Sequence, residues 1–536
     1  MKRSKLFTGM VALSAAGALM LSGCANNGGS SSDGASGSKI ISTNGGEPQN
    51  PLIPGKTNET QGGMIMDLLF AGLVSYDADG KIHNEIAESI ESSDNINWTI
   101  KIKKDWKFTD GTPVTASSFV KAWNYGAAKD NDQLNSYFFE DIKGYSDEEN
   151  VAELEGLKVV DDHTFTVELK QAAGDFAQRL GYTAYVPLPE TAFADIEAFG
   201  KKPVGNGMYK MEGTIDPSQG VTLVKNEQYK GPRKVENDGV KIKFYATQEA
   251  AYADMQGGNL DVLDAVPSAE LGNYIKDFGD RAVKQPAAVF QSFVIPSSLP
   301  GFSGEEGQLR RAAISMALDR ATITKTIFSD TRTPAKDFTS PVVDGWSDKL
   351  KGNSVLEHNP EEAKKLWEKA NAIAPFQGPL KIAYNADGGH QSWIDAVANQ
   401  IKNTLGADAE GNPLPTFAEF RTKITDRTIG SAFRTGWQAD YPGIYNFLGA
   451  IYGTGAGSND GDYSNPAFDA LIKKANESKD IVTANKYYNE AQEILLKDLP
   501  AIPLWYSTVN GVYGKDVSNV KFGWNGVPLY NEIKKG

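Results

Sequence analysis

The sequence predicts a mixed α/β protein that is divided into several lobes. The chain has 536 residues, of which 40% are hydrophobic and 23% are charged, and this is the composition of an ordinary globular protein. Segments with alternating apolar residues occur along the chain together with segments that begin with helix-capping residues. Strand and helix signals mixed in this way favour an α/β architecture, and a chain of this length divides into about two to four lobes.

Three segments are predicted to form half-buried strands, because their apolar residues recur with a period of two. They are residues 99–103, 163–169 and 240–244. The segment 109–113 is a predicted turn, in which Gly111 supplies a positive φ.

Helix starts are marked by capping residues. Asn359-Pro360 and Asn465-Pro466 each place a capping amide before a proline in the first helical turn, followed by apolar residues at helical spacing. Ser117 is expected to cap the helix that follows the turn.

The N-terminus has the features of a bacterial export signal. Residues 1–5 carry three positive charges, and residues 6–21 carry none. This apolar run is shorter than the roughly 20 residues of a spanning helix, so residues 1–23 are predicted to be a signal peptide. Small residues before Cys24 resemble the lipobox of lipoproteins, which implies lipidation of Cys24; the alternative is an incidental cysteine. Residues 24–38 then form a flexible, polar linker to a membrane anchor.

Composition excludes several classes of function. The net charge of −14 opposes nucleic-acid binding. One cysteine and four widely separated histidines give no metal-ligand spacing, so no metal or other cofactor is expected. Residues 55–57 lack the first glycine of a phosphate-binding loop, residues 453–457 lack the third glycine of a dinucleotide fingerprint, and no nucleophile elbow occurs. The chain is therefore not expected to be an enzyme, although paired carboxylates remain open.

An ordered set of short motifs extends from about residue 39 to the end of the chain. They are residues 46–50, 69–73, 86–89, 98–102, 106–116, 204–209, 226–229, 312–320, 440–441 and 501–504. Together they resemble the substrate-binding proteins of ABC importers that take up oligopeptides and dipeptides. The stretch 106–116, Trp-Lys-Phe-Thr-Asp-Gly-Thr-Pro-Val-Thr-Ala, is the most recognisable of them.

The resemblance implies an α/β fold with two hinged lobes and an extra subdomain on one of them. The expected first lobe comprises residues 39–70, 200–288 and 508–536. The extra subdomain comprises residues 71–199, and the second lobe residues 289–507. A peptide is then enclosed between the lobes as an added strand, with main-chain hydrogen bonds that do not read its side chains. A monomer is expected.

Asp440 is the first candidate binding residue, because it matches the position at which the family pairs an aspartate with the ligand's α-ammonium. A carboxylate in a closing cleft needs a cation to offset its desolvation. The alternatives are a solvated loop aspartate or one paired with a protein arginine. Main-chain groups of Gly436 and Gln438 are expected to bind the ligand's first residue. Asn58 and Thr60 align with the segment that pairs with the peptide main chain.

Two further groups of residues are assigned through the resemblance. Arg434, Arg427 and His390 are candidates for the ligand's carboxylate, against the alternative of surface arginines and a structural histidine. Trp437, Trp505, Tyr506 and Phe420 are candidates for lining side-chain pockets, although core packing is the commoner role of such aromatics. A tyrosine that flanks the peptide in the family has no clear equivalent, since Tyr137 is shifted.

The sequence therefore predicts a lipoprotein on the extracytoplasmic face of the cell membrane that captures short peptides and delivers them to an ABC permease. An alternative is the same scaffold binding a sugar, an opine, a metal chelate or haem. A secreted hydrolase and a surface protein that reports peptide levels are two further hypotheses.

Overall fold

The computed structural model describes residues 39–48, 50–245, 247–386, 389–415, 417–478 and 480–536. The predicted signal peptide, Cys24 and the linker lie outside these residues. No helix within the described ranges combines the length and the apolar character needed to cross a membrane.

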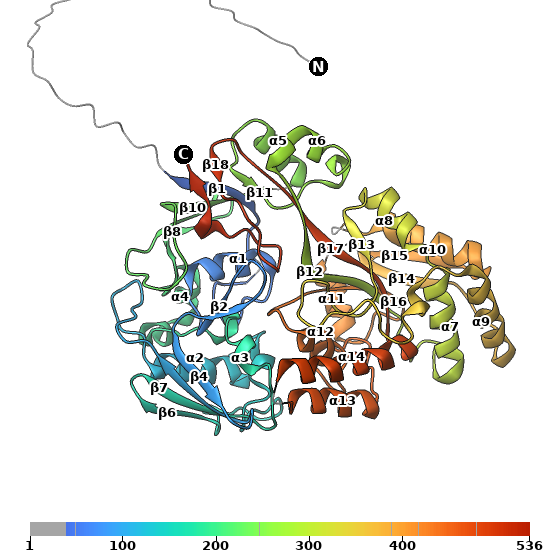
Figure 1. Cartoon of the computed structure of the whole chain (residues 1–536), viewed down its shortest axis with the longest axis horizontal. Helices are drawn as coiled ribbons and strands as arrows, with labels where there is room; N and C mark the ends of the chain where they lie inside the picture. The colour runs from blue at the N-terminus through green and yellow to red at the C-terminus, as the bar shows by residue number, and fades with distance from the viewer. Residues whose placement is uncertain (1–38, 49, 246, 387–388, 416, 479) are drawn as a thin grey trace, which may run out of the picture. The chain divides into compact units, whose positions relative to one another are not determined.

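One large mixed sheet of eleven strands extends through the described chain (Figure 1). Its outermost strand at one end, β15, pairs in parallel with β14, and at the other end β8 and β9 form an antiparallel hairpin. In order across the sheet, the strands are β15 (Ala409–Leu414), β14 (Leu380–Asn385), β16 (Ala432–Gln438), β12 (Ala282–Val294), β17 (Ala501–Tyr513), β11 (Val262–Leu263), β1 (Ile40–Gly45), β10 (Gly239–Phe244), β9 (Gly220–Lys225) and β8 (Tyr209–Asp216), with β13 (Arg332–Pro334) paired to β17.

Three smaller sheets accompany it. A four-stranded antiparallel sheet has the order β4 (Ala87–Ser92), β5 (Asn97–Ile102), β7 (Thr164–Glu168), β6 (Leu157–Asp161). The two-stranded sheets are β2 (Val74–Tyr76) with β3 (Ile82–Asn84), and β18 (Val517–Ser518) with β19 (Lys534–Lys535).

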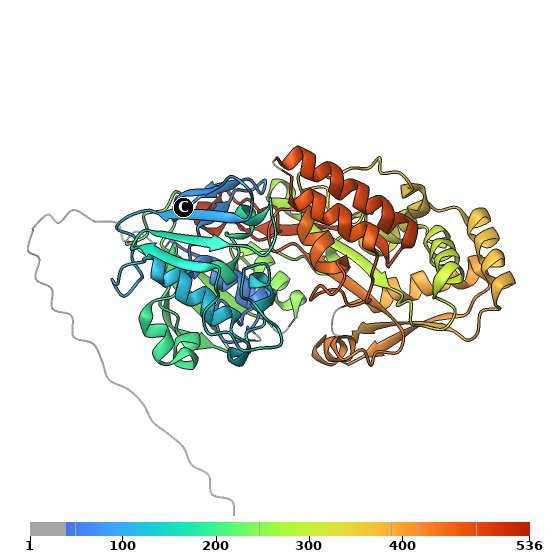
Figure 2. The same ribbon diagram turned by 90° about the horizontal axis from the view of Figure 1, so that it is seen from below.

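The helices are distributed over the whole described chain, and α13 and α14 lie side by side in both views (Figures 1 and 2). They are α1 (Thr60–Leu69), α2 (Ala116–Ala127), α3 (Phe176–Arg179), α4 (Ile196–Lys201), α5 (Gln248–Gln256), α6 (Tyr274–Phe278), α7 (Gly304–Ala317), α8 (Arg320–Phe328), α9 (Pro360–Ile373), α10 (Gln391–Leu405), α11 (Phe417–Thr425), α12 (Ile444–Tyr452), α13 (Pro466–Asn476) and α14 (Ile481–Asp498).

The local predictions are largely confirmed. Strands β5, β7 and β10 overlap the three segments with alternating apolar residues, and β5 and β7 end one residue before the predicted limits. Asn359 and Asn465 accept hydrogen bonds from backbone amides in the first turns of α9 and α13. The expected cap at Ser117 is wrong: Thr115 is the N-cap of α2 and forms a capping box with Ser118, because these two residues have the three-residue spacing that reciprocal bonding requires.

The buried apolar residues form two large cores, which β12 and β17 connect. The first core gathers residues between Ile41 and Val262, together with residues from 509–533. The second core gathers residues between Ala288 and Tyr506, together with Trp524. Both long strands pass from one core to the other, and the register between them breaks between Pro286 and Phe290. The exact lobe boundaries of the sequence analysis stay a prediction.

Candidate functional site

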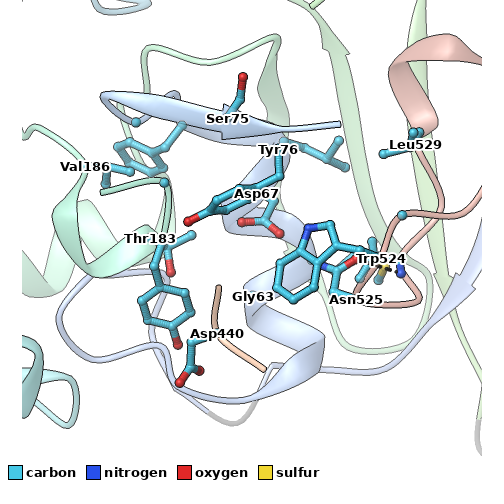
Figure 3. A pocket seen from close by; sticks show the side chains of 18 of the residues that line it. Gly63, Asp67, Ser75, Tyr76, Thr183, Val186, Asp440, Trp524, Asn525 and Leu529 are labelled. Atoms are coloured by element: carbon cyan, nitrogen blue, oxygen red, sulfur yellow. Dashed lines mark hydrogen bonds between the residues drawn. The ribbon is translucent and has the colours of Figure 1, made fainter. Parts of the chain in front are cut away.

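A cavity of about 280 Å³ lies where the first core meets the end of β16 and the C-terminal loop. Polar residues around the start of α1 line it together with Gln438 and Asp440, and Figure 3 shows Asp67, Asp440 and Trp524 among the lining residues. The residues that line it are Thr57, Asn58, Glu59, Thr60, Gly63, Met64, Asp67, Leu68, Phe70, Gly72, Val74, Ser75, Tyr76, Asp77, Glu85, Gly181, Tyr182, Thr183, Val186, Met208, Arg233, Gln438, Ala439, Asp440, Gly523, Trp524, Asn525, Val527, Pro528, Leu529, Tyr530 and Asn531.

Asp440 lines this cavity, and its carboxylate forms no ion pair within the described part of the chain. Its Oδ2 accepts a hydrogen bond of 2.9 Å from Nδ2 of Asn446, and its backbone N–H donates to Oδ1 of Asn446 over 3.0 Å. Burial raises the pKa of Asp440 to about 6, although the bond from Asn446 lowers it. The ionised carboxylate therefore lacks the countercharge that its desolvation requires.

Asn446 is itself held by a residue of the sequence analysis. Nε1 of Trp437 donates to Oδ1 of Asn446 over 2.8 Å, and Asn446 is buried on α12. Trp437 does not line the cavity. Its indole instead fixes the amide that orients Asp440.

Three other predicted residues share the cavity wall with Asp440. Asn58 precedes α1, and Thr60 is the first residue of that helix. Gln438 ends β16, and its Nε2 donates to the carbonyl of Asn525 over 3.0 Å. Gly436, two residues earlier, is exposed and pairs with Gln291 of β12. The roles of these residues in binding a ligand main chain stay predictions.

The structure places the three candidates for carboxylate binding away from this cavity. Arg427 forms an ion pair with Asp462 at 2.8 Å, so its guanidinium already has an acidic partner. Nε of Arg434 donates to Asn385 over 2.9 Å, and its guanidinium carbon lies 5.1 Å from the ring centre of Phe420. Nδ1 of His390 accepts a 3.1 Å hydrogen bond from the indole of Trp393. Their carboxylate-binding role stays a prediction, and the cavity wall described above does not include them.

The remaining aromatic candidates lie in the second core rather than on the cavity wall. Phe420 and Trp505 are buried, and Trp505 packs edge-on against Trp393 with ring centres 5.4 Å apart. Tyr506 is also buried, and its hydroxyl donates to Asp337 over 2.7 Å. These three rings pack in the second core of the structure, and their lining of a ligand pocket stays a prediction.

The sequence analysis assigned no binding role to several residues of the cavity wall. Tyr76, Tyr182 and Trp524 supply aromatic surface, and Asp67 supplies a second carboxylate. Asp67 interrupts the apolar run Met64-Ile65-Met66-Asp67-Leu68-Leu69 of α1. A lone charge within an apolar helix was the available signal for a side chain that faces an internal cavity.

The sequence profile of the bacterial extracellular solute-binding proteins, family 5, matches residues 81–459. The chain belongs to this family. It is consequently an extracytoplasmic solute-binding protein and not an enzyme. Within the described residues, no group of three or more histidine, cysteine or acidic side chains is arranged to hold a metal ion.

Individual relatives extend over nearly the whole chain. The oligopeptide-binding protein OppA of Bacillus subtilis is 27% identical over 88% of this chain and 88% of its own length. A probable deoxycholate-binding periplasmic protein of Escherichia coli, YgiS, is 24% identical over 90% of this chain and 89% of its own. The solved structure of the murein tripeptide binding protein MppA of Escherichia coli superposes with a TM-score of 0.79 at 22% identity, covering 92% of this chain and 98% of that protein. The α/β substrate-binding fold is thereby established.

Proposed function

We propose that this protein captures short peptides in the cavity beside Asp440 and delivers them to an ABC importer from a lipid anchor at Cys24. The observation that carries the proposal is the carboxylate of Asp440, which faces the cavity without a cationic partner in the described residues. A peptide's α-ammonium supplies the missing charge through a charge-assisted hydrogen bond. The name of the relative OppA supports an oligopeptide as the ligand.

Neighbouring groups support the same assignment. Asn58 and Thr60 on one wall and Gln438 on another offer amide and hydroxyl groups to a peptide main chain. Such contacts bind the backbone of the ligand and do not select for particular side chains. We further propose that residues 24–38 tether the folded part to the membrane, since their composition has nothing to bury.

The test is a calorimetric titration of the secreted form, residues 25–536, with trialanine and N-acetyl-trialanine. Acetylation removes the ammonium, and Asp440→Asn removes the carboxylate while keeping a hydrogen-bonding group beside Asn446. Loss of one partner of a buried charge pair costs about 2–5 kcal/mol, so either change should weaken binding by roughly 30-fold to several thousand-fold. Asp277→Asn, an exposed aspartate on α6, is the matched control and should leave the affinity unchanged.

The same titration at two pH values gives an independent readout of Asp440. The α-ammonium binds the ionised carboxylate, and burial raises the pKa of Asp440 in the free protein to about 6. Protonation then competes with the ligand below that pH, and affinity for trialanine should fall by about tenfold between pH 7.5 and pH 5. In Asp440→Asn this pH dependence should largely disappear. Equal binding of free and acetylated trialanine would contradict the amine assignment.

A non-peptide solute is the second candidate, and the relative named for deoxycholate binding favours it. The cavity's chemistry opposes that particular class of ligand, because a bile acid is anionic and Asp440 needs a cation. Sugars, opines, metal chelates and haem stay alternatives. Mass spectrometry of small molecules released by denaturing the purified protein separates them: peptides support the proposal, and any of the others overturns it.

A further inference from the structure

A second carboxylate, that of Asp67, faces the same cavity as Asp440. The neighbouring residues Met66 and Leu68 are buried, whereas Asp67 is open to the cavity (Figure 3). Over the described part of the chain, Asp67 forms neither a hydrogen bond nor an ion pair. Desolvation raises the pKa of Asp67 to about 6, although the positive charge of Arg233 lowers it.

Acidic side chains outnumber basic side chains in the cavity wall. The wall includes five acidic residues and a single basic residue, Arg233. Arg233 is already committed to Glu85, with 2.7 Å between Nη2 and Oε1. The other wall acids have local partners: Asp77 accepts from His83 over 2.9 Å, and Glu59 accepts from the backbone of Gly62 in the first turn of α1.

Two carboxylates, those of Asp67 and Asp440, therefore form no ion pair with the described residues, although the charge of Arg233 acts on Asp67 from the same wall. Both lie near the same aromatic side chains, since the charges of Asp67 and Asp440 each raise the pKa of Tyr76 and of Tyr182. The two acidic positions are thus neighbours within one cavity, and one small ligand with two positive charges can reach both.

Aromatic surface surrounds Asp67. Tyr76 and Trp524 line the same cavity as Asp67, and the charge of Asp67 acts on Tyr76 (Figure 3). The two rings meet edge to face with centres 5.6 Å apart, and the hydroxyl of Tyr76 donates to the carbonyl of Gln178, which fixes the ring. Electron-rich ring faces attract ammonium and guanidinium groups, and a carboxylate binds the same groups through charge-assisted hydrogen bonds.

We propose that Asp67, Tyr76 and Trp524 form a subsite for a lysine or arginine side chain of the same peptide whose α-ammonium is bound by Asp440. This inference rests on the proposed function and deepens it, because it assigns a class of preferred substrate: short peptides with a basic residue close to the N-terminus. Binding through the peptide main chain accepts many sequences. The subsite makes the protein prefer, among these peptides, those that carry a lysine or arginine side chain.

The test compares lysine peptides with neutral counterparts of similar shape. Lys-Ala-Ala, Ala-Lys-Ala and Ala-Ala-Lys are titrated into the secreted form at pH 7.5, each beside the same peptide with norleucine in place of lysine. At least one lysine peptide should bind ten or more times tighter than its norleucine counterpart. In Asp67→Asn this ratio should fall to near one, while the norleucine peptides change by less than about threefold.

The control variant is Asp277→Asn, which lowers the net negative charge by the same amount on an exposed surface and should keep the lysine preference. Absence of a lysine preference in the wild-type protein, or an equal loss of all peptides in Asp67→Asn, would overturn the subsite. If trialanine still binds through Asp440 in that case, the subsite alone is refuted. If no peptide binds at all, the proposed function and the subsite are refuted together.

Discussion

The two cores are joined in two regions of different character. In the first region, the hinge strands β12 and β17, each 13 residues long, pair with each other and pass from one core to the other. Their side chains in the second core, among them Phe290 and Leu504, are fully or almost fully buried. This connection combines chain continuity, a backbone ladder and apolar burial.

The second region, which we name the outer contact, joins residues 80–179 to residues 441–478 mainly through polar groups. The hydroxyl of Tyr441 donates to Oδ2 of Asp175 over 2.7 Å, and the guanidinium of Arg179 lies 4.8 Å from the ring centre of Tyr445. The other contacts are the packing of Gly80 against Pro442, the bond from Asn95 to the carbonyl of Ser478 and the bond from Gly174 to the carbonyl of Asn476.

The hinge strands and the outer contact are expected to have different roles. Apolar burial along the hinge strands stabilises the fold, whereas the polar outer contact affects how tightly the ligand is held. Apolar burial along the hinge strands is lost only on unfolding, whereas a few hydrogen bonds can be exchanged for bonds to water when two surfaces part. Tyr441 follows Asp440 directly, so the proposed amine site and the outer contact share one short segment. We expect substitutions at the hinge strands to change stability and those at the outer contact to change affinity.

The largest effect is expected from Leu504→Ala on β17. Its side chain is fully buried in the second core, and truncation of such a leucine costs about 2–5 kcal/mol of unfolding free energy. Calorimetric unfolding should show this loss, while the trialanine affinity of the folded protein changes by less than about threefold. A large loss of trialanine affinity with little loss of unfolding free energy would contradict the assignment of the hinge strands to fold stability.

An intermediate effect is expected from Gly80→Ala in the outer contact. A Cβ atom at Gly80 would lie 2.9 Å from Cβ of Pro442 and 3.2 Å from Cγ of Trp524. Such overpacking costs about 1–3 kcal/mol, which should weaken trialanine binding by roughly 5- to 100-fold. Gly111→Ala is the matched control, because Gly111 has a similar positive φ of 90° but no atom within 4 Å of the added Cβ. Equal affinities of the two variants would show that the clash is irrelevant to binding.

The smallest effect is expected from Tyr441→Phe. The substitution removes one hydrogen bond to Asp175, which keeps its 2.7 Å ion pair with Arg179. A loss of about 1–2 kcal/mol from the contact should speed peptide dissociation by roughly 5- to 30-fold in a stopped-flow experiment. Tyr463→Phe deletes a comparable 2.8 Å bond to Asp498 within the second core and should leave dissociation unchanged. Parallel changes in both variants would argue against a special role for the outer contact.

Local features of the fold were predictable because short segments determine them. Asparagine followed by proline located the starts of α9 and α13, and apolar alternation located β5. The partners of the strands were not predictable in this way. Strand β1 pairs in parallel with β10, about two hundred residues further along the chain, and no local pattern contains that pairing.

The residues of the candidate site show the same difference between what a short sequence motif predicts and what depends on long-range packing. The family motif identified Asp440 as a candidate binding residue before the structure was known. In the structure, Asp440 lines one cavity together with Asn58, Thr60 and Gln438. Asn446 could not be inferred, since its role depends on how α12 turns back towards β16. Trp524 lies far from α1 in sequence but faces the same cavity, so only the folded chain reveals that the two share a wall.

The position of β17 in the sheet has a consequence for the order of synthesis. This strand lies between β12 and β11 in the large sheet, yet it is among the last elements of the chain. The loop that carries Trp524 follows it. The large sheet therefore gains this strand only after β12 and β11 have been made, and pairings over such sequence separations form slowly. Because Trp524 also lines the cavity, the wall of the proposed binding site is completed later than the strands that precede β17.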